Sequence, residues 1–331
     1  MNIHIRQPVE FEKIVAHRHV QYIELTRHRM AVQQLLDSGD NHASLKSRLK
    51  QYIAGYAQVC ASIDPSEKLQ KQPLFDWVID AKPVQSSCWK FETVLARTVM
   101  SNLLQKEAFE QIQQGEHVSA SNLFKEATQE HTKAYQCLLT WKWKLASANH
   151  PVLQRDWHIG MIHHLQSMQN LCMLCLGLGK QSPSKTLYVV AQRAAAAAAK
   201  SIAFWPDRVS TLKVSQSMQN LMSSHVLWDR EEYGGSIDRL QSSIGHDTVE
   251  IFGFQSIQDE LDKVPFLLQE RKQINNGAYF DAIKPAAPLP VPQELIYMGP
   301  KDEPHPQSTR NSLMEPVVDE EYASTPLSED S

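Results

Sequence analysis

Two histidines and two cysteines in one short stretch form the pattern that most resembles a site for chemistry. His163 and His164 precede a Cys-x-x-Cys pair made by Cys172 and Cys175. Thiolates and imidazoles at such spacing bind zinc, and a Cys-x-x-Cys pair also exchanges disulfides. Here apolar residues stand between and around the cysteines, which is typical of a buried helix, whereas a zinc knuckle needs a turn. We therefore expect buried thiols and neither metal nor cofactor; a metal-dependent enzyme using these four residues remains an alternative.

No other group of residues falls into a catalytic pattern. The chain has 14 histidines but lacks Gly-x-Ser-x-Gly, a phosphate-binding loop and His-Glu-x-x-His. The Gly234-Gly235 pair is more typical of a helix end than of a phosphate-binding turn. The nearby acids Asp229, Glu231 and Glu232 favour a solvated loop. We expect a protein that is not an enzyme.

Charge and hydropathy exclude further classes. The 331 residues include 33 Lys and Arg against 37 Asp and Glu, a net charge of −4 that does not suit a nucleic-acid binder. Apolar stretches end well before the ~20 residues that span a bilayer, and the first residues show no secretory signal. An odd number of cysteines, five in all, favours a reducing cytosolic compartment.

The spacing of apolar residues predicts helices along most of the chain, joined by short turns. The expected helices are Glu10 to Leu36, 45–59, Ser86 to Gln114, a helix from Ser119 or Ser121, one from Pro151 to Gly179, one from Ser184 that contains Ala194 to Ala199, Val209 to Asp229, Ser236 to Ile244 after a tight turn at Gly234-Gly235, and Ser256 to Asn275 with a kink or fresh start at Pro265. Residues 63–85, with three prolines, are expected to form a surface loop. Helices stacked in this way resemble tetratricopeptide-type hairpins.

The composition changes near the C-terminus. Residues 284–300 are rich in proline and should follow an extended path. The PxxP spacing within Pro285–Pro290 predicts either an SH3-type partner or a strap lying against the body. Residues 301–331 hold eight acidic and two basic residues and few large apolar ones, which predicts disorder. The expected domains are a helical domain over 1–300 and an acidic disordered tail over 301–331.

Four short segments occur in an order that resembles the BRO domain, the Bro/Alix-type module of endosomal sorting proteins. They are Phe75-x-Trp77 followed by Asp80; Ser86, Phe91 and Glu92 at the start of a long helix; Tyr233-Gly234 with Ile237 and Leu240; and Asn275, Tyr279 and Pro285. The resemblance spans roughly residues 10–295. The chain departs from the family at Val99, where asparagine is common, and at Met168 to Leu171, which replace a Gln-Ala-Gln-Glu run.

The resemblance implies an all-α fold: a curved, banana-shaped body around a tetratricopeptide-like core of helical hairpins, with a few short strands near the N-terminus. It also implies a non-enzymatic adaptor, cytoplasmic and peripherally attached to endosomes. Such domains bind the amphipathic C-terminal helix of an ESCRT-III (charged multivesicular body protein) subunit and thereby support endosomal sorting and membrane remodelling. The alternative is a signalling scaffold, of the pH-response or Rho type, that acts through the Pro-rich strap and the tail.

The resemblance also places the partner-binding patch, near the end of the middle helix and the start of the next. The matching residues are Leu176, Leu187, Tyr188 and Gln192. Gln192 stands where the family usually has an apolar residue. The alternative from the residues alone is that Leu176 and Leu187 belong to the core.

Overall fold

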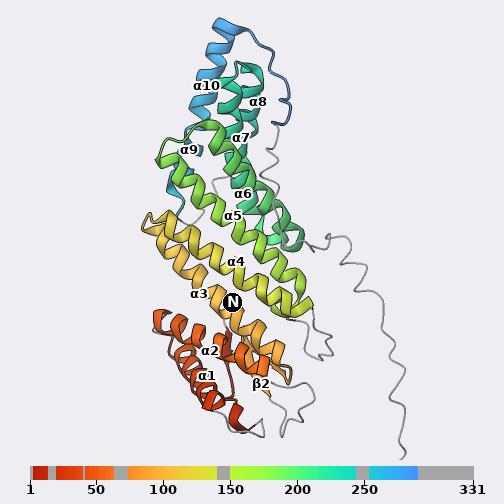
Figure 1. Cartoon of the computed structure of the whole chain (residues 1–331). Helices are drawn as coiled ribbons and strands as arrows, with labels where there is room; N and C mark the ends of the chain where they lie inside the picture. The colour runs from red at the N-terminus through yellow and green to blue at the C-terminus, as the bar shows by residue number, and fades with distance from the viewer. Residues whose placement is uncertain are drawn as a thin grey trace, which may run out of the picture. The chain divides into compact units, whose positions relative to one another are not determined.

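The computed structural model describes residues 3–13, 20–39, 42–62, 74–139, 150–243 and 253–289, and these are overwhelmingly helical (Figure 1). The long elements are α1 (Val20–Ser38), α2 (His42–Ser62), α3 (Trp89–Gln113), α4 (His117–Leu139), α5 (Arg155–Gly179), α6 (Ser184–Phe204), α7 (Val209–Asp229), α8 (Tyr233–Ser243), α9 (Gln255–Asp262) and α10 (Val264–Ile274). Short helical turns lie at η1 (Phe11–Lys13), η2 (Pro151–Leu153), η3 (Pro206–Arg208) and η4 (Asn275–Tyr279). The all-α prediction is confirmed.

From α3 to α8 each helix packs on the next one along the chain, as in stacked helical hairpins (Figure 1). The alanine run of α6 explains part of this packing, because Ala194 and Ala198 are buried and bring little bulk to the contact with neighbouring helices. Small polar groups then reach across: Ser167 Oγ on α5 donates to the Ala194 carbonyl at 2.9 Å. The sequence thus specifies closely spaced helices tied by buried hydroxyls.

The N-terminal part holds a small antiparallel sheet, in the order β1 (Ile3–Ile5), β2 (Phe75–Ile79) and β3 (Lys82–Ser86). The surface loop predicted for 63–85 is therefore wrong from Phe75 onward. Asp80 and Ala81 take left-handed φ values of 48° and 66°, the geometry of a two-residue hairpin turn. Pro83 is tolerated because β3 lies at the edge of the sheet. The short strands implied by the resemblance are present.

Several helix boundaries differ from the predicted ones. Where the sequence predicts one helix from Glu10 to Leu36, the structure has η1 at Phe11–Lys13 and α1 from Val20, and residues 14–19 lie outside the described ones. Gly115, with φ of +79°, follows the end of α3 at Gln113 and marks the stop that the sequence predicts. The next helix, α4, begins at His117, earlier than the predicted Ser119 or Ser121. Pro265 does mark a fresh start, since α9 ends at Asp262 and α10 begins at Val264.

The Gly234-Gly235 pair is not a turn but the first part of α8. Segment 280–289 lies against this helix. The Ala286 amide donates to Asp238 Oδ2 at 3.3 Å, and Arg239 Nη2 donates to the Ala286 carbonyl at 3.1 Å. The strap interpretation of the Pro-rich stretch is therefore confirmed up to Leu289, which is buried. Pro290 and everything after it, including the predicted tail, lie outside the described residues.

By its contacts the chain divides into two units, Met1–Val291 and Pro292–Ser331. The first contains every described element. In the described part of the chain, no helix combines the length and apolarity needed to cross a membrane.

Candidate partner-binding surface

The cysteine and histidine pattern belongs to the interior of α5. Cys172 and Cys175 are buried, and desolvation by burial raises the pKa of both thiols, that of Cys175 to about 12. His164 is also buried, and its pKa falls to about 4 because desolvation disfavours the imidazolium. Within the described ranges no group of histidine, cysteine and carboxylate side chains is arranged to hold a metal. These residues act as packing groups.

A second pair of histidines joins α4 to α5. His131 Nδ1 and His158 Nδ1 lie 3.0 Å apart, and His158 Nε2 lies 2.8 Å from the Val152 carbonyl. The carbonyl requires a proton on His158 Nε2, so His131 must donate through Nδ1. His131 Nε2 then carries a lone pair that has no partner among the described residues. Burial lowers the pKa of both rings, that of His158 to about 4.

The predicted partner patch lies where α5 ends and α6 begins, but its residues do not share one surface. Leu187 is 8% exposed and packs against α5: a Cβ at Gly177 would come within 2.6 Å of Leu187 Cδ2. Tyr188 is 6% exposed and lies toward α7, where Gln219 is its hydrogen-bonding neighbour. The side chains of Leu187 and Tyr188 thus serve contacts with two different helices.

The other two predicted residues are half-buried. Leu176 lies one turn from the end of α5, and Gln192 lies on α6 with a buried Oε1 that has no partner among the described residues. Sequence reasoning missed Met173, whose side chain is 46% exposed on α5. Its position three residues before Leu176 was the available signal, because i and i+3 share a helix face. Met173 and Leu176 form the outward apolar face of α5 near its C-terminus.

The residues of the first two sequence segments meet at a buried carboxylate. Glu92, at 0% exposure on α3, accepts from Arg29 Nε at 2.8 Å, Tyr52 Oη at 2.5 Å and Trp77 Nε1 at 2.6 Å. Phe75 lies beside this cluster, with the Arg29 guanidinium 5.9 Å from its ring centroid. One acid therefore ties α1, α2 and β2 to α3. Its role is structural.

The acid within the Phe-x-Trp segment that becomes buried is Asp76 rather than Asp80. Asp76 is fully buried, and its Oδ2 accepts from Gln85 Nε2 at 2.9 Å. Asp80 instead occupies the hairpin turn.

The last two segments close the C-terminal end of the helical array. A Cβ at Gly234 would come within 2.1 Å of the Ala282 carbonyl oxygen, so only glycine fits there. Asn275 bridges the turn: its Nδ2 donates to the Asp281 carbonyl at 2.8 Å, and its Oδ1 accepts from the Asp281 amide at 3.0 Å. Tyr279 stacks on Tyr233 with ring centroids 3.8 Å apart.

Ile237 and Leu240 fill the inner face of α8 at 0% exposure. Pro285 is exposed on the strap. The other family-motif residues pack or hydrogen-bond within the described unit.

Comparison with known proteins finds a similar fold but no similar sequence. No protein-family model and no curated protein matches the chain. Among solved structures, an ALIX BRO1 domain in complex with CHMP4C superposes with a TM-score of 0.66 at 14% identity, covering 80% of each chain. The chain has the BRO-domain fold.

Two further solved structures agree. ALIX in complex with the SIVmac239 PYKEVTEDL late domain gives a TM-score of 0.67 at 15% identity, over 80% of this chain and 41% of that one. A Bro1-domain structure described as the basis for endosomal targeting gives 0.57 at 13% identity, over 95% and 94%. The low identities match the departures from BRO-type sequence noted above.

Proposed function

We propose that this BRO-fold chain is a non-enzymatic adaptor that binds the C-terminal amphipathic helix of an ESCRT-III subunit. The observation that carries the proposal is the likeness to an ALIX BRO1 domain solved with CHMP4C. The order of the BRO-like motifs along the chain supports it. Peripheral attachment to endosomes would follow from the partner.

The partner helix would lie over the C-terminal part of α5 and the start of α6. Met173 supplies an exposed, adaptable thioether, and Leu176 lies on the same face. Lys180, four residues after Leu176, and Lys185, at the start of α6, are exposed and suit an acidic residue on the partner. An amphipathic helix placing its apolar face here uses the helix-in-groove mode. Leu187 and Tyr188 would act from beneath, by fixing the α5–α6 spacing and the α6–α7 contact.

The test is a titration of the full chain with C-terminal peptides of ESCRT-III subunits. We expect saturable binding of about micromolar affinity. Met173→Asp places a charge on the proposed contact without entering the core, and should weaken binding at least about ten-fold. Met30→Asp is the matched control, because Met30 on α1 is 43% exposed against 46% for Met173. It should leave the affinity unchanged.

Leu187→Asp would test the stability of the fold and not the partner contact, because a charge at an 8% exposed site disturbs the packing of α6. If Met173→Asp and Met30→Asp bind equally, the partner surface is not on α5. If no ESCRT-III peptide binds the unmodified chain, the adaptor proposal itself is refuted.

The scaffold alternative acting through the Pro-rich strap receives no support from the described part of the strap. Both backbone groups of Ala286 are hydrogen-bonded to α8. An SH3-type module reads a freely accessible extended segment. Such a partner would have to displace the strap from α8 before binding.

A further inference from the structure

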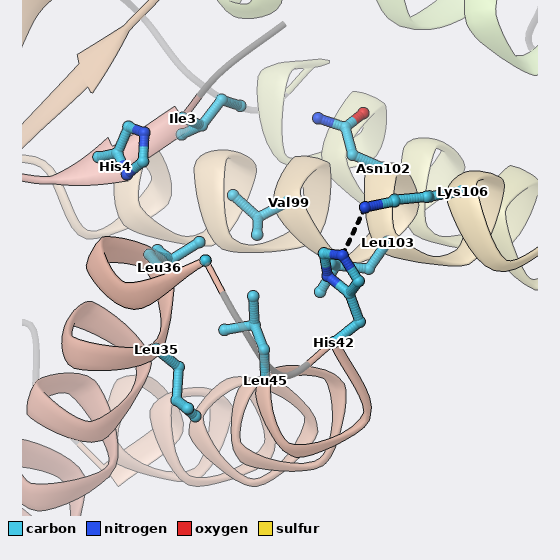
Figure 2. Close-up of a pocket in the computed structure, with 11 residues that line it drawn as sticks. Ile3, His4, Leu35, Leu36, His42, Leu45, Val99, Asn102, Leu103 and Lys106 are labelled. Carbon is cyan, nitrogen blue, oxygen red and sulfur yellow. Dashed lines mark hydrogen bonds between the residues drawn. The ribbon is translucent and has the colours of Figure 1, made fainter.

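A cavity of about 380 Å³ lies between β1, α1, α2 and α3, remote in the fold from the α5 surface. Its volume falls within the ~300–1,000 Å³ of small-molecule sites. Figure 2 shows apolar side chains from all four elements around it. The apolar lining consists of Ile3, Leu35, Leu36, Leu45, Val99 and Leu103.

Hydrogen-bond donors gather at one end of the cavity. Lys106 and Asn102 project from α3, and His42 from the start of α2 (Figure 2). Lys106 Nζ lies 2.5 Å from His42 Nε2. An ammonium group can only donate, so His42 accepts through Nε2 and keeps its proton on Nδ1. Lys106 retains further N–H groups for a ligand.

Glu107, next to Lys106 in the sequence, pairs with Lys46. Asp37 lies 4.0 Å from Nδ1 of His4, a residue that also lines the cavity. The ion pairs found among the described residues join Lys106 to no acid. The first turn of α2 adds the positive end of a helix dipole on the same side. The donor end is therefore cationic, while the remaining lining is apolar except for His4 and Gly39.

We propose that this cavity binds a small amphiphilic carboxylate, a compound with one anionic head and an unbranched apolar body. The head would accept from Lys106 and Asn102, and the body would lie between Leu35, Leu103 and Val99. Since a water molecule takes roughly 30 Å³ of liquid, the cavity has room for about a dozen atoms of that size. Decanoate, with about a dozen non-hydrogen atoms, has a suitable volume. The inference does not depend on the proposed adaptor function.

The test is calorimetric titration of the full chain with decanoate. We expect one saturable site. Lys106→Met keeps the apolar stem but removes the charge, and it should weaken binding about ten-fold or more, as expected for a charge-assisted hydrogen bond. The matched control is Lys125→Met, at an exposed position on α4 outside the cavity, which should bind as the unmodified chain does. The uncharged 1-decanol should bind about as weakly to the unmodified chain as decanoate does to Lys106→Met.

A second readout locates the ligand. In a chain with labelled leucine methyl groups, decanoate should shift the signals of Leu35, Leu36 and Leu103 first. Shifts confined to leucines outside the cavity would overturn the proposal. It would also be overturned by absence of saturable binding, or by equal affinity of decanoate for the Lys106→Met and Lys125→Met variants.

Discussion

Glu92→Gln should destabilise this protein more than any other single change of a charged side chain to its neutral isostere. The carboxylate of Glu92 is fully buried and accepts hydrogen bonds from Arg29, Tyr52 and Trp77. Glutamine offers one acceptor oxygen, and its NH₂ group would face donors. At least one buried donor loses its partner, and the Arg29 guanidinium, 0% exposed, loses its counter-charge.

The magnitude follows from the two losses. Breaking a buried ion pair by removing one partner costs about 3–5 kcal/mol, and this range already contains much of the cost of the orphaned donor, about 1–3 kcal/mol. We therefore expect the free energy of unfolding to fall by about 4 kcal/mol. Because whole domains are stable by only about 5–15 kcal/mol, the change is large.

The assay is urea-induced unfolding at neutral pH, followed by circular dichroism and by tryptophan fluorescence. The matched control is Glu107→Gln, because Glu107 pairs with Lys46 while its side chain is 39% exposed. That change should cost no more than about 1 kcal/mol. Adding Arg29→Met to Glu92→Gln should cost less than the sum of the two single changes, since the unpaired cation is then removed.

Two results would refute this reasoning. One is a loss for Glu92→Gln as small as that for Glu107→Gln. The other is additivity of the Arg29 and Glu92 changes, which would mean that the two side chains do not stabilise each other.

Three further predictions concern the buried groups and the C-terminal closure. The pKa of His158 is about 4 in the fold against 6.5 ordinarily, so its contribution to the free energy of unfolding is complete above pH 6.5 and is lost as the pH falls toward 4. At about 1.4 kcal/mol for each pKa unit, the loss is about 3 kcal/mol. Urea unfolding at pH 7 and at pH 4.5 should show most of this loss, and His158→Gln should make the stability less dependent on pH. Gly234→Ala should release segment 280–289, because the new methyl group meets the Ala282 carbonyl, and it should lower the free energy of unfolding by about 1–3 kcal/mol. Limited proteolysis should then cut this segment faster than in the unmodified chain. An unchanged rate of cutting would contradict the contact. Cys172 and Cys175 should resist alkylation by iodoacetamide in the native protein, because they are buried and their pKa values are raised; labelling at the rate of a free thiol would show that α5 is not packed as described.

Local pattern was sufficient to predict that the helices from α3 onward exist, although α4 and α8 begin earlier than predicted. Their apolar residues recur with helical spacing, and Gly115 and Pro265 mark stops that depend on backbone geometry alone. The same reasoning failed at β2, where prolines on either side suggested a loop. The strand exists because Phe75 and Trp77 are buried against α2 and α3, partners that are distant in sequence. Pattern reasoning sees only neighbours along the chain.

The candidate site shows the same division. The motifs located α5 and α6 correctly, but they did not tell which face of each helix is covered. The resemblance assigns Leu187 and Tyr188 to the partner patch, but they are buried by α5 and α7, whereas Met173, in the apolar stretch between the two cysteines, is exposed. A helix in a stacked array has neighbours on two sides, so its apolar stripe is wide and does not reveal its exposed edge.

The sequence by itself determined the helical class, the order of the helices and the absence of a recognisable catalytic motif, because these depend on composition and on short-range spacing. Only the tertiary structure decided that Glu92 gathers Arg29, Tyr52 and Trp77, that Gly234 receives the strap, and that Lys106 and His42 meet at the end of an apolar cavity. Each of these joins residues from separate elements. Their proximity is set by how helices and strands pack, and no periodicity along the chain encodes it.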